Sequence, residues 1–503
     1  MLMKDYNPES FRRSSKEPRR QVDPKRAWWK PATHVVGWVF VVLLRALLVL
    51  RNLCIAGFFY SRRLARGMVR QTIAQPARMG LLVVTAGLMA VSFAVWTSRG
   101  LSFSFGAENP KAELASELQR QLVTKEELSK HLGEAVRKNQ LPENIQLEIA
   151  SIPVQAKIDY ALDEDLQRVS DRLLKNYRPD YGVIVAMDAT TGRILAMSSH
   201  RSGRPSEENL ALKASFPAAS IFKVVTAGAV LDTQKVTPDT LVPFQGSNHT
   251  LYKRNVITQK ENRWTRRMSV REAFGASVNT IFGKLGLFYA GPEVLREYAE
   301  RFHFNHPIRA DVPVDVGYSR FSAEDPWSVV SAASGYTQDN TMSPLQGAMI
   351  AAAVVNDGAM MEPWMIENVV DHQGNLLYSA EPRLAVHAID ATTAKSMRRL
   401  FRATVESGTS RQAFRKALRR RAFDEVEVGG KTGSLTGLHP RGKCDWFVGY
   451  MSDGTRKIAV AALTVNEEKW RVKSATLAES LFTHELTSSA VENRRPSSTH
   501  AGR

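Results

Sequence analysis

The chain has 503 residues, 44% of them hydrophobic and 23% charged, which is an ordinary globular composition with room for several domains. Its net charge of +18 is uneven, because the first 100 residues hold 17 Lys and Arg against 4 Asp and Glu. A nucleic-acid-binding protein usually concentrates positive charge on a folded domain. Here the charge surrounds apolar segments, so we expect a membrane-topology signal and no nucleic-acid partner. Two distant cysteines and scattered histidines predict neither a disulfide framework nor a metal or other cofactor.

The N-terminal region is predicted to carry the chain into a membrane. Residues 1–34 are polar and basic, which predicts a disordered cytoplasmic tail. Residues 79–97 form an uncharged stretch of 19 residues, long enough to cross a bilayer as a retained anchor. Between them, 35–78 contains an apolar stretch, 35–60, that is interrupted by Arg45 and Arg51 and followed by several arginines, so we expect it to lie in the membrane interface or to dip into the membrane as a hairpin. A second crossing by this segment stays open, although it would place the C-terminal domain in the cytoplasm.

Residues 98–150 link the predicted anchor to the rest of the chain. Over 107–139, leucines recur among many Glu, Lys and Gln residues, which predicts an amphipathic helix that forms a stalk or packs on the following domain. The C-terminal residues 484–503 are rich in Ser, Arg and Glu, and we expect them to be disordered. A globular domain is therefore predicted over 151–483.

Strand patterns lie at both ends of this domain, with helical patterns between them. Val183–Met187 and Ile194–Met197 are short apolar runs on either side of a turn and predict a β-hairpin. Three later apolar runs predict strands followed by a helix near 473–483. They are Lys431–Leu435, Trp446–Met451 and Ile458–Val465. This order predicts an α/β (α+β) fold in which helices cover one antiparallel sheet.

Three short motifs carry the chemistry of this domain. Each alone is a weak signal, but their order and gaps are typical of enzymes that acylate a serine with penicillin or D-Ala-D-Ala peptides. They are Ser220-x-x-Lys223, Ser277-x-Asn279 and Lys431-Thr432-Gly433-Ser434.

In the first motif, a serine hydroxyl is a poor nucleophile unless a base lies within hydrogen-bond reach. If a helix begins at Ser220, positions i and i+3 share one face, so the amine of Lys223 lies beside the hydroxyl. The residues after Lys223 are almost all apolar. Burial should therefore lower the pKa of this amine, as a general base near neutral pH requires.

The other two motifs predict substrate contacts. We expect Ser277 to pass a proton between the two lysines and the leaving amine, and Asn279 to bind the amide of the substrate's side chain. Taken alone, Ser277 and Asn279 are better explained as a helix N-cap with a neighbouring Asn, and only the other two motifs favour the catalytic roles.

The glycine-rich run that contains Gly433 predicts a strand edge along which a substrate backbone pairs. Lys431 would attract a carboxylate, to which Thr432 or Ser434 would donate hydrogen bonds. The backbone N–H groups of Ser220 and Ser434 are the expected oxyanion donors.

Over residues 150–482 the chain resembles the transpeptidase domain of penicillin-binding proteins. Beyond the three motifs, the resemblance rests on 158–167, 183–197, 341–346 and 445–450. It implies an α/β subdomain and an all-helical subdomain with the active site between them. It is a resemblance to monofunctional, membrane-anchored class B-like members with a reduced pedestal, because only 98–150 separate the anchor from the domain.

The resemblance implies a peptidoglycan D,D-transpeptidase for cell-wall synthesis. Ser220 would be acylated by a D-Ala-D-Ala stem peptide and would pass the acyl group to an amine of a second stem peptide. β-Lactams would be trapped on the same serine. It further implies a periplasmic or extracytoplasmic catalytic domain anchored in the bacterial cytoplasmic membrane. A glycan polymerase or other cell-wall synthesis proteins are the implied protein partners.

Three other functions stay open at this point. A D,D-carboxypeptidase would use the same residues with water as the acceptor. A serine β-lactamase is disfavoured, because no Glu-x-x-Leu-Asn motif follows the second motif. A non-catalytic β-lactam sensor or scaffold would not need the complete set of motif residues, and residues 1–34 are too short for a sensor's effector domain.

Overall fold

The computed structural model describes residues 123–149, 151–203 and 208–492. The predicted tail, interfacial segment and anchor (1–34, 35–78 and 79–97) lie outside these residues. Among the residues described, no helix is long and apolar enough to span a bilayer.

The centre of the fold is a five-stranded antiparallel sheet with the order β14-β15-β16-β3-β4. The predicted hairpin is confirmed as β3 and β4, and the three predicted C-terminal strands are confirmed as β14, β15 and β16. The strands are β3 (Tyr181–Asp188), β4 (Ile194–Arg201), β14 (Glu427–Leu438), β15 (Arg441–Ser452) and β16 (Lys457–Asn466).

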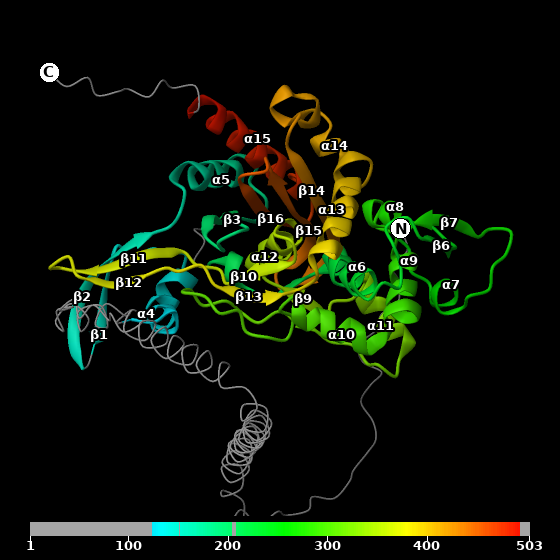
Figure 1. Ribbon diagram of the computed structural model, residues 1–503, viewed down its shortest axis with the longest axis horizontal. Helices are drawn as coiled ribbons and strands as arrows, with labels where there is room; N and C mark the ends of the chain where they lie inside the picture. Colours follow the sequence, from blue (N-terminus) through cyan, green and yellow to red (C-terminus); the bar gives the residue numbers. More distant parts are fainter. Residues whose placement is uncertain (1–122, 150, 204–207, 493–503) are drawn as a thin grey trace, which may run out of the picture. The chain divides into compact units, whose positions relative to one another are not determined.

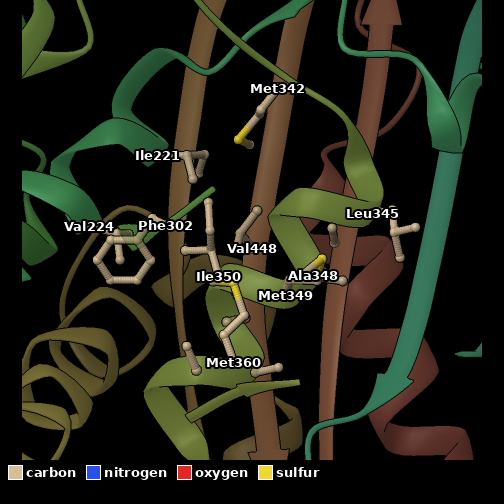
Figure 2. Close-up of a cluster of buried hydrophobic side chains, with 14 of the residues drawn as sticks. Ile221, Val224, Phe302, Met342, Leu345, Ala348, Met349, Ile350, Met360 and Val448 are labelled. Carbon is tan, nitrogen blue, oxygen red and sulfur yellow. The ribbon is translucent and has the colours of Figure 1, made fainter. Parts of the chain in front are cut away.

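Helices cover both faces of this sheet (Figure 1). Side chains alternate along each strand. Trp446, Val448 and Tyr450 therefore belong to one core, while Phe447 and Met451 belong to the core on the other face. On the face of the first core, α12 (Pro344–Val355) packs against the sheet, and all of its residues are buried. On the same face, α13 (Ala391–Glu406) packs on β14. Figure 2 shows Ile350 of α12 beside Val448 of the sheet. The other face carries α5 (Glu164–Tyr177) and α15 (Ser474–Glu492).

The C-terminal tail predicted over 484–503 begins too early, because α15 continues to Glu492. His484 bonds to Asp165 of α5, and Glu485 forms an ion pair with Arg456. Leu486 packs against the apolar core. Contacts with distant parts of the chain therefore hold a segment whose own composition favoured disorder.

A helical region adjoins the edge of the sheet formed by β14. It begins with the short helix η3 (Ala219–Phe222) and α6 (Lys223–Asp232), and one small two-stranded sheet lies within it. The remaining elements are β6 (Leu241–Phe244), α7 (Lys253–Ile257), β7 (Arg266–Ser269), α8 (Val270–Gly275), α9 (Asn279–Lys284), the π-helix η4 (Leu285–Ala290), α10 (Gly291–Arg301) and α11 (Pro326–Ser334). Together with the central sheet, this region gives the predicted α/β fold with a helical part.

A second sheet was not predicted. It has the order β1-β2-β11-β12 and packs with α4 (Lys125–Arg137), which lies within the predicted amphipathic helix. Its strands are β1 (Asn144–Ile149), β2 (Ile152–Tyr160), β11 (Ile366–Asp371) and β12 (Leu376–Ser379). The hairpin β1–β2 crosses the boundary expected at residue 150, so the segment 98–150 is not wholly a helical linker. The pairing of β2 with the much later β11 explains why the local pattern missed it.

Two further small sheets lie in the described part of the chain, which also contains the short helices η2 (Leu210–Leu212), α14 (Arg411–Phe414), η5 (Ala417–Arg419) and η6 (Arg421–Phe423). One contains β5 (Phe216–Pro217), β8 (Tyr318–Ser319) and β9 (Asn340–Met342), with β9 in the middle. The other pairs β10 (Ala359–Met361) with β13 (Leu384–His387). Because β5 immediately precedes η3, its pairing with β9 fixes the chain directly before Ser220.

Candidate active site

The first motif lies where η3 runs directly into α6. The α-helix expected to begin at Ser220 begins at Lys223, and Ser220 sits in the preceding 3₁₀ turn. In a 3₁₀ turn the side chains at i and i+3 eclipse one another. The Lys223 Nζ is accordingly 2.8 Å from the Ser220 Oγ, as the spacing predicted. Ser220 is half-buried, whereas Lys223 is fully buried.

The amine of Lys223 has two further partners. It donates to the Oδ1 of Asn279 at 2.7 Å and to the backbone carbonyl of Ser334. Burial, together with the nearby positive charge of Lys431, holds the pKa of Lys223 well below its usual value. A neutral amine has two N–H groups and one lone pair. When Lys223 is neutral, its two N–H groups can stay on Asn279 and Ser334 while the lone pair accepts from the Ser220 hydroxyl, which is the arrangement a general base needs.

The second motif spans the junction between α8 and α9. Ser277 adopts a positive φ of 55°, and its Oγ accepts a hydrogen bond from the Nζ of Lys431 at 2.9 Å. Asn279 begins α9 and donates from its Nδ2 to the carbonyl of His249 at 2.8 Å. Each residue of the motif therefore accepts a hydrogen bond from a different lysine: Ser277 from Lys431, and Asn279 from Lys223. The sequence had predicted Ser277 alone as the link between both lysines.

The third motif lies on β14, which is an edge strand of the sheet, as expected. Lys431 is fully buried and also donates to the carbonyl of Thr432 at 2.8 Å. The strand passes very close to the nucleophile. A Cβ added at Gly433 would lie 3.3 Å from the backbone nitrogen of Ser220. Ser434 is exposed on the same strand. Its N–H and that of Ser220 stay the predicted oxyanion donors.

Burial lowers the pKa of Lys431 to about 7, so near neutral pH the unliganded site carries only part of the positive charge that its predicted role requires. The ammonium is nearly complete at about pH 6, half lost at about pH 7 and mostly lost at about pH 8. A carboxylate bound beside the amine would raise this pKa and restore the charge.

Acylation by penicillin should therefore take up a proton at about pH 8. The bond exchange itself is proton-neutral, because the serine proton ends on the lactam nitrogen. If the penicillin carboxylate binds beside Lys431, up to one proton per adduct should enter from solution. An indicator dye in weakly buffered solution measures this uptake, which should disappear at about pH 6. Equal uptake by a Lys431→Met variant acylated to completion would contradict the assignment.

Three residues of the site were not predicted. The hydroxyl of Thr409 hydrogen-bonds to that of Thr432, and the Thr409 N–H donates to the carbonyl of Gly275 at 3.0 Å. Ser334 contributes its carbonyl to Lys223, and Gly335 closes α11 in the left-handed conformation. Only Gly335 has a sequence signal, since glycine commonly ends helices. Within the described residues, no group of three or more His, Cys, Asp or Glu is placed to hold a metal ion.

Comparison with known proteins agrees with this geometry. The family model described as the penicillin binding protein transpeptidase domain matches residues 182–484. The chain is 27% identical over 322 residues to the peptidoglycan D,D-transpeptidase PbpA of Mycobacterium tuberculosis, covering 58% of this chain and 63% of that protein. It is also 27% identical over 292 residues to the stage V sporulation protein D of Bacillus subtilis, covering 54% and 43%. The chain thus spans less than two thirds of the length of these relatives.

Solved structures show the same fold. The ampicillin complex of penicillin-binding protein 3 from Mycobacterium tuberculosis aligns with a TM-score of 0.57 and 20% identity, covering 70% of this chain and 82% of that one. The imipenem acyl-enzyme of penicillin-binding protein A from the same organism gives a TM-score of 0.54 and 21% identity, covering 66% and 79%. The family model covers more than half of the chain, and the three motifs converge on one site. The chain therefore belongs to the penicillin-binding protein transpeptidase domain family.

Proposed function

We propose that this protein is a peptidoglycan D,D-transpeptidase that works through an acyl-enzyme on Ser220. The observation that carries the proposal is the fully buried Lys223. Its Nζ lies 2.8 Å from the Ser220 Oγ, and its other hydrogen bonds end on Asn279 and Ser334. This arrangement activates a serine near neutral pH without a histidine.

The proposed first step is acylation. The Ser220 Oγ attacks the carbonyl carbon of the penultimate D-Ala and passes its proton to the Nζ of Lys223. The backbone N–H groups of Ser220 and Ser434 stabilise the oxyanion. The C–N bond then breaks, and the proton held by Lys223 passes by way of the Ser277 hydroxyl to the leaving D-Ala amine, so that Lys223 is neutral again; Lys431 holds Ser277 at 2.9 Å. An amine of a second stem peptide attacks the ester by the reverse route and forms the cross-link.

The rest of the site fits the shape of this substrate. Lys431, Thr432 and Ser434 would bind the terminal carboxylate, and the backbone of β14, including Gly433, would pair with the peptide. The Oδ1 of Asn279 accepts from Lys223, and one N–H of its Nδ2 donates to His249. The second N–H and the remaining lone pair of Oδ1 would bind the substrate amide.

The proposal includes a place and partners. Residues 79–97 would anchor the chain in the bacterial cytoplasmic membrane, with the catalytic domain on the extracytoplasmic side. Peptidoglycan stem peptides would be its substrates, and β-lactams would bind covalently to the same site. A glycan polymerase or another cell-wall synthesis protein would supply the strands.

Intact-mass analysis of the full chain in detergent tests the proposal. Incubation with penicillin should give a long-lived adduct on Ser220. Incubation with a D-Ala-D-Ala peptide or its thioester analogue plus an amine acceptor should give the transfer product. Hydrolysis without transfer would indicate a carboxypeptidase, and rapid loss of the penicillin adduct a β-lactamase. Absence of any adduct would leave a non-catalytic module.

A further inference from the structure

A basic arm extends from the helical region beside the active site. The arm is residues 245–267, which follow β6, contain α7 and end with the first two residues of β7; these elements lie at the right-hand side of Figure 1. Between these limits the chain has six Lys and Arg residues against one Asp or Glu. All six cations are exposed, and among the described residues the one acid, Glu261, pairs with Arg267. Lys253, Arg254, Lys260, Arg263 and Arg266 carry the uncompensated charge.

The arm also presents aromatic rings to solvent. Trp264 is 69% exposed, and Tyr252 is 59% exposed. The guanidinium of Arg263 lies over the Trp264 ring at 4.9 Å from its centroid, so one face of the indole is covered by a cation. An exposed tryptophan stacked with arginine is the composition of a binding hot spot, where both residue types are enriched.

The turn that carries Trp264 is braced by its own hydrogen bonds. The Trp264 N–H donates to the Oδ1 of Asn262 at 2.8 Å, and the Asn262 N–H donates to the Oγ1 of Thr265 at 2.9 Å. The side chain of Gln245, at the opposite end of the arm, donates to Thr265 at 3.1 Å and to the carbonyl of Lys260 at 3.0 Å. The indole is therefore displayed by a preorganised turn, which lowers the entropy lost on binding.

The same arm reaches the catalytic residues. The Asn279 N–H donates to the carbonyl of Asn248 at 2.8 Å, and the Asn279 side chain bonds to both His249 and Lys223. Farther along, Leu251 and Val256 of the arm pack against Val330 of α11. A polymer lying on the arm would therefore pass close to Asn279, which contacts the amine of Lys223 beside Ser220.

We propose that the arm binds the glycan strand that carries the reacting stem peptide, an inference that rests on the proposed function. The C–H face of a sugar ring would stack on Trp264, and Lys260 and Arg263 would bind carboxylates along the strand. A membrane surface also attracts aromatic and basic residues. The hydrogen bonds to Asn279 favour the glycan, because they connect the arm to the active site that the strand's peptide must reach.

Substrate length separates this role from catalysis. In the full chain, Trp264→Ala should lower the affinity for uncross-linked glycan strands that carry stem peptides by about tenfold, as expected for loss of one aromatic anchor. Sedimentation with these strands, after penicillin has blocked Ser220, measures binding without activity. Cross-linking of the strands should fall to a similar extent. Acylation by penicillin and transfer between soluble stem peptides should change less than about twofold.

Two control variants match this change. Trp470→Ala removes another exposed tryptophan, 39% exposed and beside Lys473, which precedes α15 on the other face of the sheet. A Lys260→Gln and Arg263→Gln pair should weaken strand binding, whereas Arg415→Gln with Arg419→Gln, also exposed, should not. Unchanged strand binding by Trp264→Ala, or equal loss in Trp470→Ala, would overturn the proposal.

Lysine acetylation followed by mass spectrometry distinguishes a glycan from a membrane. With the full chain in vesicles of phosphatidylglycerol and phosphatidylethanolamine, added strands should protect Lys253 and Lys260 but leave the exposed Lys416 reactive. Protection by the vesicles alone, without strands, would assign the arm to the membrane and reject the glycan. Both the binding and the acetylation readouts work even if no penicillin adduct forms, so failure of the proposed function would be seen separately.

Discussion

Replacing Lys223 with alanine should lower the rate at which penicillin acylates the protein by roughly 10²- to 10⁴-fold, the usual contribution of a general base. The buried Nζ of Lys223 is 2.8 Å from the nucleophile and has its N–H partners in Asn279 and Ser334. The rate in the unmodified protein should rise with pH as this amine, whose pKa burial lowers, becomes neutral. Fluorescent penicillin labelling over time measures it. Ser220→Ala should give no covalent label.

The matched control for Lys223→Ala is Lys284→Ala. Lys284 is also a buried lysine, and its Nζ donates to the carbonyl of Pro243 at 2.9 Å. Lys223→Ala leaves buried acceptors on Asn279 and Ser334 without this donor, and Lys284→Ala leaves the partly buried carbonyl of Pro243 without one, at a cost of about 1–3 kcal/mol of unfolding free energy each. We expect both variants to lose similar thermal stability, but only Lys223→Ala to be acylated slowly by penicillin. That result would show that the slow acylation comes from the chemistry and not from loss of folding. Labelling of Lys223→Ala at the original rate would reject Lys223 as the base.

The sequence predicted what depends on local spacing or on strand periodicity. The contact of Ser220 with Lys223 follows from three residues of separation in one helical turn. The central strands follow from short apolar runs bounded by turns. The prediction that the three motifs meet at one site came from the resemblance to a known family. Their positions in the chain do not by themselves show that they lie close together.

Contacts that only tertiary packing creates were not predictable from the sequence. Ser277 and Lys431, 154 positions apart, meet directly. Thr409 reaches Thr432 across a gap of 23 residues. No periodic pattern encodes such pairs. For the same reason the sheet β1-β2-β11-β12 was missed, because Tyr160 of β2 pairs with Ile366 of β11, far away in the middle of the domain.

The second large effect is expected for Gly335→Ala, which should slow acylation at least about tenfold and lower the unfolding free energy by about 2 kcal/mol or more. Gly335 ends α11 with a φ of 68°, a conformation that costs an L-residue about 1–2 kcal/mol. An added Cβ would also lie 1.9 Å from the carbonyl oxygen of Ala219 and 3.0 Å from the nitrogen of Ser220. The peptide unit before the nucleophile must therefore move, and with it the predicted oxyanion donor of Ser220.

Gly374→Ala separates the clash from the backbone strain. Gly374 has a φ of 86° in the turn between β11 and β12, and a Cβ added there meets nothing within 4 Å. This variant should lose about 1–2 kcal/mol of unfolding free energy and keep the original acylation rate. Thermal unfolding and fluorescent penicillin labelling, with the rate expressed per folded molecule, compare the two. If Gly335→Ala acylates as fast as Gly374→Ala, the Ala219–Ser220 peptide tolerates displacement and its position does not limit acylation. A slow Gly335→Ala beside a normal Gly374→Ala would show that α11 sets the position of the nucleophile through this one close contact.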